Sequence, residues 1–118
     1  LADAILDEFH RDPERMVAWA AAAKPGDFAR HAPAVFAWAE RLDPLALALL
    51  SEAAAAIGRM VGRLLDCGAP SVCLVGGLAE PMAPWLPPPW RAKLAAPAGD
   101  ALDGAILLAR QSLEAARG

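Results

Sequence analysis

Ser71-Val72-Cys73-Leu74-Val75-Gly76-Gly77-Leu78-Ala79-Glu80 is the stretch that decides how this chain folds. Val72 to Val75 are consecutive, compact and apolar, and the breaker Gly68-Ala69-Pro70 precedes them, so the first half predicts a buried β-strand. The two glycines then allow a sharp turn and remove the Cβ atoms that hold a ligand away from the main chain. A helix that begins at Leu78 would add free N–H groups that attract anions. The stretch is therefore typical of a phosphate or nucleotide cradle, and equally of an ordinary strand-to-helix corner.

Length and composition predict one domain with a single core. The 118 residues are 57% hydrophobic and carry a formal net charge of −3, which leaves no basic stripe for a nucleic-acid backbone. No apolar run was expected to reach the roughly 20 residues that cross a bilayer, so the chain is predicted to be cytoplasmic and free of membrane contact. Cys67 and Cys73 are expected to be buried free thiols, and no metal site is expected.

Residues 1–67 are predicted to form a helical region. Leu1 to Phe9 has helical spacing of apolar residues, and Asp12-Pro13 restarts a helix with a capping carboxylate followed by proline. Asp27 is expected to cap a short segment that runs toward His31, and Pro33 to lie in the first turn of the next helix.

The longest helix is predicted from about Pro44, capped by Asp43, to Asp66. Gly58 and Gly62 weaken this helix, which indicates close approach by another backbone or by a ligand, with packing as the better explanation. The face expected to enter the core consists of Leu45, Leu49, Ala53, Ile57, Met60 or Val61, and Leu64.

Residues 68–118 form the second predicted region. It contains the strand, the Gly-Gly corner, a stiff proline-rich connector over residues 81–90, and a weak second strand at Arg91 to Ala96. Asp100 is expected to cap a final helix that buries Leu102, Ala105, Ile106, Ala109 and Leu113.

One strand and one weak strand cannot make a stable sheet, because a buried strand needs paired neighbours on both sides. We therefore expect the strand partners of Val72 to Val75 to lie either in sequence before Leu1 or in another copy of the chain, as in a homodimer. The absence of an initiator Met agrees with the first expectation, that the chain is a piece of a longer protein.

Several motifs together resemble a known family. They are Val17-Ala18-Trp19-Ala20, Asp43-Pro44, Gly68-Ala69-Pro70, Val75-Gly76-Gly77-Leu78-Ala79 and Asp100-Ala101-Leu102-Asp103-Gly104-Ala105. In this order they resemble the C-terminal half of the BadF/BadG/BcrA/BcrD ATPase family, in particular its glucosamine and N-acetylglucosamine kinase branch. The resemblance covers nearly the whole chain.

The resemblance implies an α/β, predominantly helical fold. The chain would be a fragment of the C-terminal lobe of an actin/hexokinase-like (ribonuclease H-like) ATPase, with one or two parallel strands. It further implies that the main chain of Gly76 and Gly77 lies against the adenosine and α-phosphate of ATP, and that Gly104-Ala105 packs against the same corner. Leu78, which follows the glycines, is included in the expected cofactor site. Glu80 is expected to face a ribose, and the alternative is an exposed acid in the first turn of a helix.

The same resemblance limits what this chain can do alone. The phosphate loops, the acid that positions Mg²⁺ and the base that deprotonates the sugar belong to sequence before Leu1, so no catalytic residue is assigned here. Phosphoryl transfer depends on positioning and on charge stabilisation, and we therefore expect the isolated fragment to be inactive.

The remaining polar residues have simpler explanations. His10 and His31 are expected to be exposed or capping, and Asp12, Asp43 and Asp100 to be helix caps. The leading hypothesis is an amino-sugar kinase that uses ATP and Mg²⁺. The alternatives are an ATPase that activates a radical dehydratase through an iron–sulfur cluster, which needs exposed cysteines, and a helical interaction module without a ligand.

Overall fold

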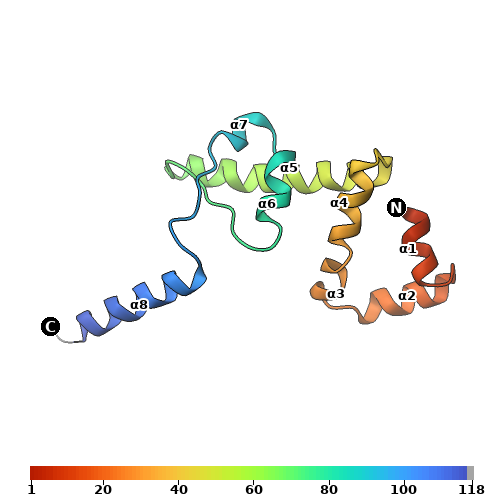
Figure 1. Ribbon diagram of the computed structural model, residues 1–118, viewed down its shortest axis with the longest axis horizontal. Coiled ribbons are helices and arrows are strands. Elements are labelled where there is room, and N and C mark those ends of the chain that lie inside the picture. Colours follow the sequence, from red (N-terminus) through yellow and green to blue (C-terminus); the bar gives the residue numbers. More distant parts are fainter. Residues whose placement is uncertain (117–118) are drawn as a thin grey trace.

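A computed structural model describes residues 1–116, and within them the chain is organised around one long helix, α5 (Figure 1). In chain order the elements are α1 (Ala2–Glu8), α2 (Pro13–Ala22), α3 (Pro25–Ala29), α4 (Ala32–Glu40), α5 (Pro44–Asp66), α6 (Ala79–Met82), a 3₁₀ turn η1 (Ala83–Trp85), α7 (Pro88–Arg91) and α8 (Ala101–Ala115). The predominantly helical prediction is confirmed.

Helix α5 has the predicted bounds but not the predicted buried face. Asp43 Oδ1 accepts a hydrogen bond from Ala46 N–H at 2.9 Å and so caps the helix as expected. The buried positions are Ala46, Leu50, Ala54, Gly58 and Val61. Of the face expected from the sequence, Val61 is buried, Ala53 and Ile57 are half-buried, and Leu45, Leu49, Met60 and Leu64 are exposed. The helix is apolar on both sides, and its neighbours cover the side where alanine and glycine allow close approach.

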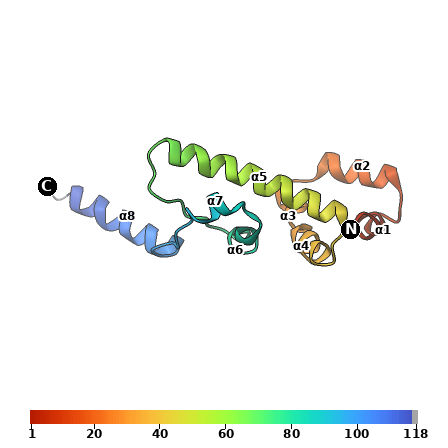
Figure 2. The ribbon, with the colours of Figure 1, turned by 90° about the horizontal axis from the view of Figure 1, so that it is seen from above.

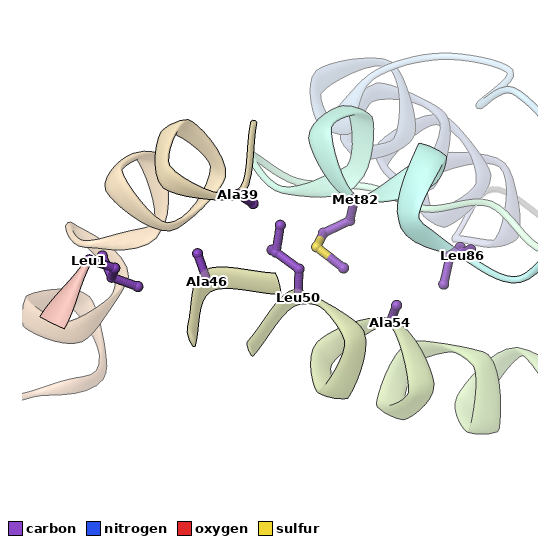
Figure 3. Close-up of a cluster of buried hydrophobic side chains, with 7 residues drawn as sticks. All are labelled: Leu1, Ala39, Ala46, Leu50, Ala54, Met82 and Leu86. Atoms are coloured by element: carbon purple, nitrogen blue, oxygen red, sulfur yellow. The ribbon is translucent and has the colours of Figure 1, made fainter. Parts of the chain in front are cut away.

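The core lies between α5 and the elements packed along it. Three side chains pack against the face of α5 that carries Ala46, Leu50 and Ala54 (Figure 3). They are Ala39 of α4, Met82 of α6 and Leu86, which follows η1. The cluster is Leu1, Ala39, Ala46, Leu50, Ala54, Met82 and Leu86. Because three of its seven members are alanines, the core is thin and depends on close backbone approach.

Trp90 of α7 packs onto the glycine pair of α5. A methyl group placed on Gly58 would lie 2.9 Å from Trp90 Cδ1, and one placed on Gly62 would lie 3.1 Å from Trp90 Cη2. The packing explanation of the two glycines is thus confirmed, with an indole ring rather than a backbone as the partner.

Helices α1, α2 and α3 lie with α4 at the end of the molecule where α5 begins (Figure 2). Asp12 Oδ1 accepts from Glu14 N–H at 2.9 Å, as predicted for a cap. Trp19 lies between Phe9 and Phe28, with ring centroids 5.2 Å and 4.9 Å away. The prediction for Asp27 is wrong in position: Lys24 occupies the cap of α3, and the Asp27 carboxylate accepts from Lys24 N–H at 2.8 Å from within the first turn.

No regular β-strand occurs in residues 1–116, which corrects the expectation of one or two strands. What remains is a single parallel bridge between Val72 and Leu94. Val72 N–H donates to Lys93 O at 3.0 Å, and Ala95 N–H donates to Val72 O at 2.9 Å. The two predicted strand segments therefore do meet in parallel. Among residues 1–116, each segment pairs only with the other, and their single bridge does not extend into a ladder.

Helix α8 projects away from the other helices, and the molecule measures 64 × 33 × 22 Å as a result (Figure 1). Asp100 caps it as predicted, accepting from Leu102 N–H at 2.7 Å and Asp103 N–H at 2.9 Å. Its expected buried face is exposed, and nothing lies within 4 Å of a methyl group placed on Gly104. The expected packing of Gly104-Ala105 on the Gly-Gly corner is therefore absent from the described residues.

Two further expectations are corrected. Cys67 and Cys73 are free but exposed: Cys67 is the C-cap residue of α5, and Cys73 follows Val72 in the extended segment. Helix α5, in which an 18-residue window has a mean hydropathy of 1.5, is long and apolar enough by length and composition to cross a bilayer, contrary to the expectation that no such run exists. The core helix of a globular protein meets the same criterion, and one face of α5 forms the core described above.

Candidate functional site

The Gly-Gly corner leaves its main chain open. Gly76 has a φ of +104°, a conformation that side-chain-bearing residues rarely adopt, and its carbonyl accepts from Ala79 N–H at 3.0 Å to close the turn. A methyl group placed on Gly76 or on Gly77 would meet nothing within 4 Å. Glycine is therefore required at position 76 for its conformation, and neither position is filled by packing.

Beside this corner lies an open groove of about 870 Å³. One wall consists of Leu74, Val75 and Gly76 with Ala79, Glu80 and Ala83; the other consists of Leu94, Ala95, Ala96, Pro97, Gly99, Asp100 and Ala101. The Val72–Leu94 bridge joins the two walls at their base. The groove falls within the range of about 300–1,000 Å³ that is usual for small-molecule sites.

The four predicted site residues do not all face this groove. Gly76 and Glu80 line it. Leu78 lines a smaller groove of about 350 Å³ between the extended segment and α5, and Gly77 lines neither.

The second wall, residues 94–101, was not predicted as part of a site. A signal for it was present, since Arg91 to Ala96 was a candidate strand. Parallel strands bring their carboxyl ends to the same edge, which is where ligands bind in open α/β sheets. The parallel pairing with Val72 is what carries residues 94–101 to the Gly-Gly corner.

The negative charge of the groove disfavours the binding of a polyphosphate. Its only charged lining residues are Glu80 and Asp100, and no Lys or Arg of the described chain lines it. The Asp100 carboxylate is engaged in capping α8, whereas Glu80 makes no hydrogen bond or ion pair with any described residue. Helix α6 has only four residues, so the expected attraction of anions to a helix start is weak. The groove suits an uncharged ligand group that packs on apolar walls and hydrogen-bonds to main chain and to one carboxylate.

The other candidate residues lie away from the groove. His10 is exposed, with a φ of 55°. His31 occupies the N-cap position of α4, which is one of its two expected roles, but it is half-buried and its side chain makes no capping hydrogen bond. Its Nδ1 lies 3.7 Å from Glu8 Oε1, and its buried Nε2 has no hydrogen-bond partner among the described residues. Within residues 1–116, no group of three or more His, Cys, Asp or Glu residues could hold a metal ion.

Known proteins resemble this chain over most of its length. It is 37% identical over 109 residues to glucosamine kinase GspK of Vibrio cholerae, a match that covers 92% of this chain and 37% of that protein. It is 43% identical to the crystal structure of a provisionally assigned N-acetylglucosamine kinase from Chromobacterium violaceum, with a TM-score of 0.74, over 89% of this chain and 36% of that one. No protein-family model matches.

The chain thus spans little more than a third of the length of each relative. Both likenesses confirm the resemblance to amino-sugar kinases that the sequence motifs predicted.

Proposed function

We propose, from this homology to glucosamine and N-acetylglucosamine kinases, that the chain is the C-terminal region of an ATP-dependent amino-sugar kinase and supplies the adenosine side of its nucleotide site. The observation that carries the proposal is the open main chain of Gly76 at the edge of an apolar groove of about 870 Å³. Since the relatives bear kinase names, a nucleoside is the ligand group that this groove would take.

The residues present fit the nucleoside and not the phosphates. Leu74, Leu94 and Pro97 offer apolar surface to a base, and the free Glu80 carboxylate can accept a hydrogen bond from a ribose hydroxyl. No cation of the described chain lines the groove to neutralise a triphosphate. When bound, ATP with Mg²⁺ supplies the phosphoryl group. The phosphate contacts, the metal-positioning acid and the base for the sugar hydroxyl are therefore assigned to other parts of the longer protein, and the chain alone is expected to be inactive.

The open edge of the extended segment supports the same proposal. Val72 uses its N–H and C=O toward residues 93–95. Within residues 1–116, the N–H of Cys73, which follows it, has no main-chain acceptor, and its C=O has no main-chain donor. We propose that a strand from the remainder of the protein pairs there and completes one lobe of an actin/hexokinase-like, cytoplasmic enzyme. Pairing with a second copy of the chain is the alternative.

The test is a titration of the full-length protein with ATP, followed by phosphorylation assays with glucosamine and N-acetylglucosamine. Gly76→Val places a branched side chain on the main chain that lines the groove and should abolish measurable ATP binding, whereas Gly104→Ala on α8 should leave it unchanged. Full-length protein that does not bind ATP, or whose Gly76→Val variant binds it normally, would contradict the proposal.

One observation favours a second candidate. The activator of a radical dehydratase needs exposed cysteines, and Cys67 and Cys73 are both exposed. The kinase homologues favour the first candidate, and phosphorylation of an amino sugar by the full-length protein separates the two.

A further inference from the structure

Trp90 is the side chain through which α7 is fixed to α5. Its indole lies along α5 over both Gly58 and Gly62. A methyl group on Gly58 would be 2.9 Å from Cδ1 and 3.0 Å from Nε1 of the ring, so a larger residue at position 58 would displace the indole. The contact joins the rigid long helix to the part of the chain that leads into the groove.

The path from Trp90 to the groove is short and hydrogen-bonded. Lys93 N–H donates to Trp90 O at 3.0 Å, and Leu94 N–H donates to Arg91 O at 3.1 Å. Lys93 O then accepts from Val72 N–H at 3.0 Å. The first two bonds tie the start of the second wall, at Leu94, to α7, and the third joins that wall to Val72.

Few other contacts fix that wall. Leu94, its first residue, is half-buried and packs against the core cluster, but Ala95, Ala96 and Pro97 are exposed. Among the described residues, the only backbone hydrogen bond from these three residues to the Val72 segment is Ala95 N–H to Val72 O at 2.9 Å. Helix α8, which follows the wall, is exposed along all its described residues and does not anchor it. The width of the groove therefore depends on Leu94 and on the position of Trp90.

We propose that Trp90 is a positioning residue for the nucleotide groove: by filling the notch made by Gly58 and Gly62, it holds residues 94–97 at the distance from Gly76 that a nucleoside requires. Trp90 does not line the groove and touches no ligand. The inference rests on the proposed function, and it extends that function to Trp90, a residue outside the groove.

The first test needs no ligand. Amide hydrogen exchange is measured at Ala95 and Val72, whose N–H groups form the two bonds that join the walls, in the wild type, Trp90→Ala, Trp90→Phe and Gly58→Ala. Loss or displacement of the indole should accelerate exchange at both amides by about tenfold or more while amides in the first half of α5 stay protected, and Trp90→Phe should restore part of the protection. Gly58→Ala shifts the ring without removing it, so it decides the question if Trp90→Ala does not fold. Gly104→Ala, which also replaces a helical glycine but meets nothing within 4 Å, is the matched control.

The second test is the dissociation constant for ATP, measured by titration calorimetry on the full-length protein. Gly58→Ala should weaken ATP binding by about tenfold with an unchanged KM for the amino sugar, and Gly104→Ala should not. Unchanged exchange at Ala95, or unchanged ATP affinity in a wild type that binds ATP, overturns the inference. A wild type that does not bind ATP refutes the proposed function instead, and the exchange rates still decide whether Trp90 holds the wall.

Discussion

Leu49 and Leu50 are consecutive residues of α5, about 100° apart around the helix, and their surroundings differ: Leu49 is 42% exposed, whereas Leu50 is 4% exposed and lies in the core beside Met82 (Figure 3). The helix therefore has one covered apolar face and one open apolar face.

This pair gives a matched test of the fold. Leu50→Ala should lower the free energy of unfolding by about 2–5 kcal/mol, because it leaves a cavity among side chains that cannot close it. Leu49→Ala should cost less than about 1 kcal/mol, because its side chain is already in contact with water. Urea unfolding measures both, and equal losses would show that the two faces are buried alike.

Helices α5 and α8 should respond differently to loss of their caps. Asp43→Ala removes the acceptor for Ala46 N–H at the start of α5 and should reduce the stability of the whole fold by about 0.5–2 kcal/mol. Asp100→Ala removes the acceptor for Leu102 N–H, but α8 packs on nothing described, so only α8 should fray. Thermal unfolding and helix-resolved hydrogen exchange distinguish a global from a local loss, and a lower melting temperature in Asp100→Ala would contradict the exposed position of α8.

Glu80 should accept a hydrogen bond from the ribose of ATP if the proposed function is correct. Glu80→Gln removes the charge of the acceptor and should weaken ATP binding to the full-length protein by about tenfold. The same variant should bind 2′,3′-dideoxy-ATP as well as the wild type does, because that ligand has no ribose hydroxyl to donate. Equal weakening for both nucleotides would place Glu80 outside the ribose contact.

The two cysteines report on the open strand edge. In the chain alone, both Cys67 and Cys73 are exposed and should react with a thiol reagent without denaturant. In the full-length protein, a strand that pairs beside Cys73 should protect it, while Cys67 at the end of α5 stays reactive. Mass spectrometry after brief alkylation gives the two rates, and an equally fast Cys73 in the full-length protein would argue against strand completion.

What the sequence could predict was local. The bounds of α5 follow from Asp43-Pro44 at its start and from Gly68, whose φ of +93° terminates the helical region. The Gly58–Gly62 pair likewise predicted close packing on α5. These signals lie within a few residues of the structure that they specify.

What could not be predicted depends on distant partners. Helix α5 has a second stripe, with Leu45, Leu49 and Leu64, that is as apolar as the buried one. Only the positions of α4 and α6 decide which stripe is covered. The Val72 segment has the composition of a strand, yet a strand exists only where a neighbour extends the ladder, and here one bridge to Leu94 is all that the described chain provides. For the same reason half of the groove, residues 94–101, was missed: its wall is created by that bridge.

The open leucine face of α5 has a practical consequence for anyone who expresses these 118 residues by themselves. Together with the exposed apolar residues of α8, it forms apolar patches that favour association between molecules. The yield and homogeneity of the isolated chain should therefore fall steeply as its concentration rises. Co-expression with the remainder of the polypeptide, rather than a change of buffer, is the remedy that this geometry recommends.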